Sequence, residues 1–295
     1  MNRLTDECIL ALDAGGTSIK LALVVTDGGQ GILGFSEIPI NSSGSIEEIK
    51  QGYRSAIFAG LQLAQSHGLT IKGIGISTPG PFDYQNGISL MTHKYPALYG
   101  KSIREIIEQE VQHIPVRFMH DSNAFLIGEI QLPCYSSCKT PCVVMLGTGL
   151  GFALMHGRTL SVNSSGGPGV SIFRRPYRGE IAEEFLSKRG IMRIYQELGG
   201  VGFKTVKELD SQAHKGNALC QQVFAVTGWH AAHILAPIII EHAIDCLILG
   251  GQIAKADELL VEPIKATLKE LSIDCLVFKA QTIDAAPLVG VAQLF

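Results

Sequence analysis

Residues 10–24, LALDAGGTSIKLALV, run as an apolar segment, a short polar break and a second apolar segment. The first segment ends in a carboxylate, Asp13, which is followed by Gly15 and Gly16. Glycines let the backbone of a turn approach a ligand without a Cβ in the way, and the N–H groups of such a turn can surround phosphate oxygens. The stretch therefore predicts two strands joined by either a phosphate-binding turn or an ordinary glycine hairpin.

Two side chains of this stretch have the chemistry of a nucleotide site. Asp13 could hold a magnesium ion, directly or through water, because carboxylate oxygens are ligands that Mg²⁺ prefers. Lys20 is a weaker candidate for a contact to phosphate. The motif by itself leaves the ligand-binding and the purely structural interpretation open.

The composition indicates a soluble globular chain with a small-molecule partner. The 295 residues are 46% hydrophobic and 17% charged, enough to bury a large core and to form two domains. The formal net charge is -3 and basic residues do not cluster, so we expect neither a nucleic acid nor a membrane surface as partner.

The longest apolar stretch, residues 229–251, is interrupted by His233, Pro237 and Glu241, which argues against a membrane span. Strand pattern begins at Cys8 and leaves no room for a secretory signal. These two features predict a cytoplasmic protein.

Seven scattered cysteines indicate reduced thiols rather than a disulfide framework. Cys134, Cys138 and Cys142 lie four residues apart and could form part of a metal site. A fourth ligand is not evident nearby, so loop and core thiols are the favoured interpretation.

Strand and helix patterns alternate along the chain, which is typical of an α/β fold. Residues 45–68 predict a helix that begins with a capping box of Ser45 and Glu48. A buried strand at 71–77 follows it. The strand–break–strand pattern recurs at 143–155, about 130 residues after its first occurrence, and implies two similar halves.

Two further glycine motifs could contribute to a nucleotide site. In LGTGLG, Gly147, Thr148 and Gly149 are followed by strand rather than helix pattern, so they predict a second hairpin and not a Rossmann turn. Together with the first hairpin, this second hairpin would bind the phosphates of the nucleotide from the opposite side. Gly250 and Gly251 could lie flat against a base or ribose, or form an ordinary strand-to-helix turn.

Asp121 follows a strand and precedes a helix in HDSNAFLIGE. It could be the N-cap of that helix. It could equally accept a proton from a substrate hydroxyl, since phosphoryl transfer to an alcohol needs a positioned base.

In their order and spacing, the motifs resemble the ROK family of sugar kinases and repressors, within the actin, hexokinase and Hsp70-like superfamily. The motifs are DAGGTSIK, GIGISTPGPFD, HDSNAFLIGE, LGTGLG, AEEFLSKRGI, LILGGQ and AAPLVGVA. The resemblance implies two ribonuclease-H-like α/β domains around a central cleft, with ATP on one side and sugar on the other. We expect a smaller domain of residues 1–118, completed by a C-terminal helix at 284–295, and a larger one of residues 119–283.

The resemblance also implies roles for individual residues. It assigns Mg²⁺ to Asp13, the catalytic base to Asp121, and a substrate-binding role to Gly80 and Glu183, with Asp121 also contacting the substrate. The nucleotide would be bound by Gly15, Gly16, Thr17, Gly147, Thr148, Gly149, Gly250 and Gly251.

Three departures from the family pattern bear on function. The family's Glu-x-Gly-His sugar motif is matched only by Gly167 and Val170, so both hydroxyl partners are lost. The family's zinc-binding cysteine cluster is replaced by RRPYRGE, so no zinc site is expected. His120 stands where the family usually has asparagine, either as a substrate hydrogen-bonding group or as a core imidazole.

The sequence thus predicts an ATP-dependent kinase for a hydroxyl of a sugar or sugar derivative, in a chain that could form a homodimer. The alternative is a non-catalytic ligand-binding sensor or regulator. Because the nucleotide motif begins at Asp13, such a regulator would lack a DNA-binding domain.

Overall fold

The computed structural model describes residues 7–25, 31–256 and 258–295, and it divides into two compact α/β units. The first unit contains the residues up to Gln131 together with Val162–Pro168 and Asp284–Phe295. The second contains Leu132–Ser161 and Gly169–Ile283. Both units combine a mixed sheet with helices, which confirms the predicted fold class.

The sheet of the first unit has the order β3-β2-β1-β4-β7. Its strands are β1 (Glu7–Ala14), β2 (Ser18–Val25), β3 (Gly31–Pro39), β4 (Thr70–Thr78) and β7 (Val116–His120). The first three strands pair antiparallel, and β4 and β7 continue the sheet in parallel with β1. The hairpin predicted around Gly15 and Gly16 is present, and it pairs Asp13 with Lys20.

Alternating side chains of β1 face two helical layers. Leu10 and Leu12 pack against one layer, and Ile9 and Ala11 against the other. The first layer is α1 (Ile46–Ser66) and α2 (Ile103–Glu108), and the second is α3 (Asp121–Glu129) and α9 (Ala286–Ala292). Short elements complete the unit: β5 (Phe82–Asp83), β6 (Ile88–Ser89) and η1 (Pro96–Leu98). Helix α1 begins with the predicted capping box.

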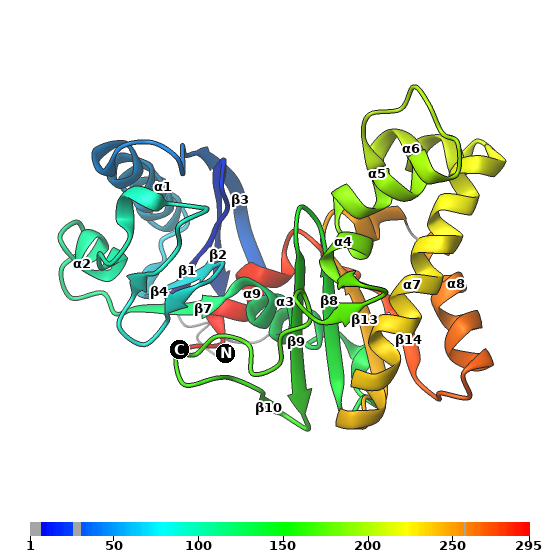
Figure 1. Ribbon diagram of the computed structural model, residues 1–295. Coiled ribbons are helices and arrows are strands. Elements are labelled where there is room, and N and C mark those ends of the chain that lie inside the picture. The colour runs from blue at the N-terminus through cyan, green and yellow to red at the C-terminus, as the bar shows by residue number, and fades with distance from the viewer. Residues whose placement is uncertain (1–6, 26–30, 257) are drawn as a thin grey trace. The chain divides into compact units, whose positions relative to one another are not determined.

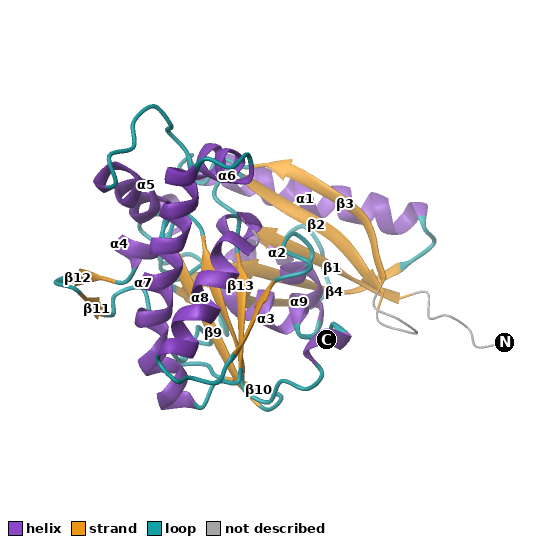
Figure 2. Cartoon of the chain, turned by 90° about the vertical axis from the view of Figure 1, so that its right-hand side faces the viewer, coloured by secondary structure: helices purple, strands orange, loops and turns teal. Residues whose placement is uncertain are grey.

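The second unit repeats this strand arrangement, as the sequence predicted. Its sheet has the order β10-β9-β8-β13-β14, again three antiparallel strands continued by two strands in parallel. The strands are β8 (Pro141–Leu146), β9 (Leu150–His156), β10 (Thr159–Leu160), β13 (Cys246–Gly250) and β14 (Leu276–Lys279), with a separate hairpin β11 (Pro176–Tyr177) and β12 (Glu180–Ile181). The helices are η2 (Pro133–Tyr135), α4 (Glu183–Leu186), α5 (Lys188–Glu197), α6 (Val206–His214), α7 (Ala218–His242), η3 (Ile253–Ala256) and α8 (Glu258–Glu270). In Figure 2, α7 and α8 lie over one face of this sheet.

Helix α7 is the one helix in the described part of the chain that is long and apolar enough, by length and composition, to cross a membrane. Of its most apolar window, 61% is buried inside the structure. The core helix of a soluble protein meets the same criterion. Here α7 contributes Val223, Phe224 and Leu235 to the core of the second unit.

The C-terminal helix is fixed to the first unit by a close crossing of α9 and α3, which lie side by side in Figure 1. A Cβ on Gly290 of α9 would lie 1.8 Å from the carbonyl oxygen of Ala124, and a Cβ on Gly128 of α3 would lie 1.9 Å from that of Ala286. Two backbones in such contact leave no room for a side chain. The sequence placed α3 in the second domain, and this crossing is why it lies in the first unit.

We expect Gly290→Ala to lower the free energy of unfolding by about 3 kcal/mol or more, because the added methyl group forces the two helices apart. Urea unfolding followed by circular dichroism measures the change. Gly216→Ala is the control: its φ of 87° strains the backbone, but nothing lies within 4 Å of the added Cβ. That variant should lose only about 1 kcal/mol. Equal losses of unfolding free energy in the two variants would contradict the close contact between α9 and α3.

Candidate active site

Polar side chains gather at one edge of the first sheet, where its parallel strands end. Asp13 lies opposite Ser77 in the pairing of β1 with β4, and Thr78 lies opposite His120 in the pairing of β4 with β7. Asp121 directly follows β7 and is close enough to Asp13 for the two charges to interact. The carboxyl ends of the parallel strands in an α/β sheet are where ligands commonly bind. The edge therefore brings together Asp13, His120 and Asp121 as a candidate active site.

Asp13 is a partly buried carboxylate with one hydrogen bond from a neighbouring strand. The Ser77 hydroxyl donates to Asp13 Oδ1 at 2.9 Å. The pKa of Asp13 is raised to about 6: burial and the nearby charge of Asp121 raise it, and Ser77, Lys20 and Lys94 oppose them. A recessed carboxylate whose charge is incompletely compensated is suited to a divalent cation.

Asp121 is held ionised by its neighbours. Burial raises the pKa of this carboxyl, but His120, Lys94 and the Ser122 N–H together lower it below its ordinary value. His120 Nδ1 lies 2.9 Å from Asp121 Oδ1. The Asp121 side chain remains 40% exposed, so it is a carboxylate that a substrate can reach.

The N-cap of α3 is His120, and the helix begins with Asp121 itself. The Ser122 N–H lies 3.2 Å from His120 Nδ1 and 2.7 Å from Asp121 Oδ1, which also accepts its hydrogen bond. The structure therefore does not support the interpretation of Asp121 as the helix cap. Nor is His120 a simple core imidazole, because it caps the helix and contacts the carboxylate at the same time.

Gly80 lies beside His120, and Tyr84 completes this part of the site. A Cβ on Gly80 would lie 3.2 Å from the Tyr84 hydroxyl and 3.6 Å from His120 Nε2. The edge of one ring faces the other in the Tyr84–His120 pair, with centroids 5.8 Å apart. The Tyr84 hydroxyl donates to the Thr78 carbonyl at 3.2 Å. The sequence motifs point to Gly80 and His120, whereas Tyr84 carries no such signal.

The loop Val162–Pro168 belongs to the same unit and packs on Tyr84. The Tyr84 N–H donates to the Ser165 carbonyl at 3.0 Å. Asn163 Oδ1 accepts from the backbone N–H groups of Ser165 and Gly167, each at 3.0 Å. Gly167 thus lies near the site with no side chain to offer, whereas Val170 packs against the core of the second unit. The Asn-Ser-Ser-Gly sequence is a turn signal that could have indicated this loop.

Two lysines lie near Asp13: Lys20, which the glycine motif predicts, and Lys94, which it does not. The Lys20 ammonium is bound to Asp284 Oδ1 at 2.7 Å, so its predicted contact to phosphate competes with an ion pair. Thr17 is exposed in the β1–β2 turn. Lys94 comes from the segment before η1, far from the glycine motif in sequence, and no motif signals it.

The remaining predicted residues lie together in the second unit. Gly147, Thr148 and Gly149 form the turn between β8 and β9, and Glu183 Oε2 accepts from the Leu150 N–H next to this turn at 3.0 Å. Gly251, which follows Gly250 at the end of β13, has φ 84°, and a Cβ there would lie 2.4 Å from the Leu146 carbonyl oxygen. Close packing of the strands therefore accounts for Gly251. The ligand-binding roles of this group stay predictions.

Aromatic contacts hold the segment that replaces the family's cysteine cluster. Tyr177 of β11 hydrogen-bonds to His230 Nδ1 of α7 at 3.0 Å, and Phe185 lies against both rings. Burial, together with the charge of Arg178, lowers the pKa of His230 to about 4, so the imidazole is neutral at pH 7. Arg178 in turn lies over the ring of Trp229. This hairpin is anchored without any cysteine.

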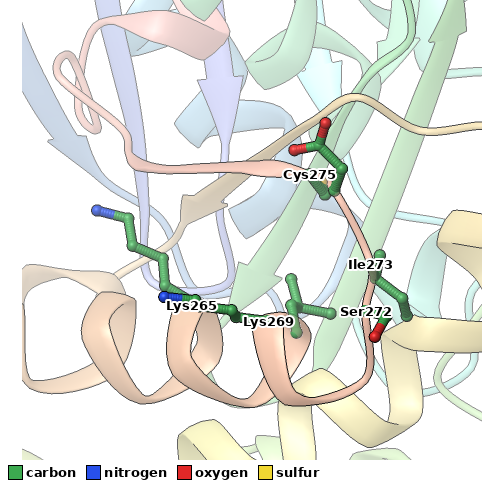
Figure 3. Close-up of a pocket in the computed structure, with 7 residues that line it drawn as sticks. Lys265, Lys269, Ser272, Ile273 and Cys275 are labelled. Atoms are coloured by element: carbon green, nitrogen blue, oxygen red, sulfur yellow. The ribbon is translucent and has the colours of Figure 1, made fainter.

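The cysteines behave as loop and core thiols. Cys142 is buried at the start of β8, and burial raises its pKa well above the ordinary value. In residues 7–25, 31–256 and 258–295, no three His, Cys, Asp or Glu side chains are grouped as metal ligands. The absence of zinc stays a prediction. Figure 3 shows a surface pocket lined by Lys265, Lys269 and Cys275, between α8 and β14, which contains none of the predicted site residues.

A family model described as "ROK family" matches residues 9–295, almost the whole chain. The chain belongs to the ROK family. Among curated ROK relatives, a glucokinase of Halalkalibacterium halodurans is 25% identical, and the match covers 89% of this chain and 85% of that protein. An N-acetylmannosamine kinase of Escherichia coli is 25% identical over 84% of both proteins.

Solved structures share the ROK fold of this chain. A ROK family glucokinase from Streptomyces griseus, in complex with glucose and AMPPNP, has a TM-score of 0.78 at 22% identity and covers 97% of this chain and 98% of its own. A ROK family transcriptional regulator has a TM-score of 0.84 at 17% identity, covering 99% of this chain and 78% of its own. Kinases and regulators of the family therefore share this fold.

We expect Asp13→Asn to stabilise the ligand-free ROK chain at pH 7.5. The pKa of Asp13, about 6 against an ordinary 3.8, means that the folded state resists ionising it. The resulting penalty is present above pH 6 and disappears as the pH falls towards 4. The variant should gain about 1–3 kcal/mol in unfolding free energy at pH 7.5 and nothing at pH 4, measured by urea unfolding. Asp274→Asn, at an exposed position, is the control and should leave the unfolding free energy unchanged. An Asp13→Asn chain that is less stable than the wild type at pH 7.5 would contradict the raised pKa of Asp13.

Proposed function

We propose that this protein transfers a phosphoryl group from Mg-ATP to a hydroxyl of a sugar or sugar derivative. One observation carries the proposal: Asp13 and Asp121, the two carboxylates that such a reaction needs, stand at the ends of β1 and β7 on one sheet edge. Membership of the ROK family and relatives named as glucokinase and N-acetylmannosamine kinase support it.

Asp121 is proposed as the general base. Its carboxylate is ionised at neutral pH and partly exposed, so it can accept the proton of an incoming hydroxyl. His120 fixes its orientation through the contact between Nδ1 and Oδ1. His120 Nε2 lies beside Gly80 and Tyr84, where we expect the sugar acceptor to bind.

The residues of the first unit fit a magnesium nucleotide. Asp13 offers a carboxylate whose raised pKa shows incompletely compensated charge, and a Cβ on Gly16 would meet only Ser42 Oγ at 3.5 Å and Lys94 Cε at 3.8 Å. Asp13 would hold Mg²⁺, directly or through water, and the turn Gly15–Thr17 would bind phosphate through its backbone. When bound, Mg-ATP supplies the phosphoryl group, and the metal neutralises its charge. In the second unit, Gly147–Gly149 and Gly250–Gly251 would bind the nucleotide, and Glu183 the sugar.

We further propose a small-molecule sugar as partner, without nucleic acid or membrane, in a cytoplasmic protein that forms a homodimer. Basic residues do not cluster in the sequence, which supports the expectation that neither a nucleic acid nor a membrane is a partner. Family resemblance alone supports the dimer. Sedimentation of the purified chain measures it directly.

A second candidate function is a ligand-binding sensor or regulator without catalysis. The observation that favours it is the loss of sugar-binding side chains at Gly167 and Val170, together with the shared fold of a ROK family transcriptional regulator. The two functions differ in one measurement: only the kinase converts ATP to ADP in proportion to acceptor phosphorylated.

We expect glucose to be a poor acceptor. A site that recognises sugar hydroxyls through buried polar groups loses discrimination when these groups are absent, so Gly167 and Val170 should relax or redirect recognition. In a panel of hexoses, amino sugars, glycosides and sugar acids, kcat/KM for glucose should lie at least about 10-fold below that of the best compound. Glucose as the best acceptor would show that other residues, such as His120 and Glu183, supply the contacts.

Asp121→Asn should leave folding and ATP binding intact while lowering turnover by about 10²-fold or more, because the general base is lost. Initial rates with the best acceptor and calorimetric ATP binding measure the two effects. Glu108→Gln, an exposed carboxylate on α2, serves as the control and should keep full turnover. An Asp121→Asn enzyme with unchanged turnover would exclude Asp121 as the base.

A further inference from the structure

Lys94 lies against the turn that we assign to phosphate binding. A Cβ built on Gly16 would be 3.8 Å from Lys94 Cε. The same position would be 3.5 Å from Ser42 Oγ, and the Ser42 N–H donates to the Gly16 carbonyl at 3.2 Å. Lys94 and Ser42 thus flank the glycine turn from two separate segments of the first unit.

The next residue, Tyr95, anchors Lys94 in this place. Tyr95 is fully buried, and its hydroxyl donates a hydrogen bond to the carbonyl of Gly15. Its ring packs near that of Tyr53 of α1, with centroids 6.4 Å apart. The backbone that carries Lys94 is therefore tied to the turn itself, and the half-buried lysine cannot drift away as an exposed surface lysine would.

The Lys94 ammonium acts on both carboxylates of the site. Burial raises the pKa of Asp13 and of Asp121, and Lys94 lowers both values. Among the residues that the structure describes, no carboxylate oxygen lies within 4.0 Å of Lys94 Nζ, so the lysine is near both charges but bonded to neither. Its N–H donors remain available to a ligand.

We propose that Lys94 is a catalytic residue that contacts the phosphoryl group during its transfer. This role rests on the kinase function proposed above. Its neighbours are the phosphate turn at Gly16, the metal-binding carboxylate Asp13 and the base Asp121, and a phosphoryl group passing from ATP to a hydroxyl at Asp121 must cross the space among them. Catalysis of this transfer consists mainly of positioning and charge stabilisation.

The proposed step conserves atoms and charge. The acceptor oxygen forms a bond to the γ-phosphorus while the bond from that phosphorus to the ADP oxygen breaks, and Asp121 takes the hydroxyl proton. Lys94 keeps its own protons throughout. Its ammonium donates hydrogen bonds to the oxygens of the phosphoryl group, where negative charge is spread in the transition state.

The test compares Lys94→Met, Lys94→Arg and the control Lys101→Met, an exposed lysine seven residues further along the chain. With the best acceptor, Lys94→Met should lower kcat by about 10²-fold with each KM changed less than about threefold, because the contact is made in the transition state. Lys94→Arg should retain part of the rate, and Lys101→Met all of it. Lys94→Ala should recover activity when ethylammonium is added, which a merely structural lysine would not permit.

Two results overturn the role of Lys94 while leaving the kinase function intact. One is unchanged kcat in Lys94→Met. The other is a raised KM for anionic acceptors alone, which would make Lys94 an acceptor-binding group. An enzyme that phosphorylates nothing in the panel would instead overturn the proposed function, and the role of Lys94 with it.

Discussion

Two like charges at one sheet edge impose the main constraint on the first unit. Parallel strands that end together place Asp13 and Asp121 near each other, and the charge of Asp121 makes Asp13 harder to ionise. Lys20 and Lys94 compensate the charge of Asp13, and His120 and Lys94 that of Asp121, from three different segments. The compensation is unequal: Asp121 is left with a lowered pKa and Asp13 with a raised one. This difference is what the proposed roles require, a carboxylate that stays ionised at Asp121 and a metal ligand at Asp13.

Local patterns made most of the fold predictable. The hairpin at Gly15 and Gly16, the capping box of Ser45 and Glu48 and the recurrence of the hairpin at 143–155 each depend on neighbouring residues, and each is present. The candidate site was predictable only in part. Asp13 and Asp121 end strands, which a sequence shows, whereas Lys94, Tyr84 and Asn163 reach the site through tertiary packing of distant loops.

Adjacent residues also took roles that the sequence could not separate. His120 and Asp121 are both able to cap a helix, and only the backbone position of α3 shows that the histidine does so. Gly167 and Val170 lie three residues apart, yet they belong to different units. Residues of one short sequence motif can therefore belong to different structural units.

The crossing of α9 with α3 constrains how the chain can be made. The second unit is complete once residue 283 has been synthesised, but the first unit lacks α9, one of the two helices of its second layer, until Ala286–Ala292 follow. Although domains commonly fold in the order of their synthesis, here the unit that contains the N-terminal half of the chain is the last to close. The edge that holds Asp13 and Asp121 therefore gains its full support only after α9 has been synthesised.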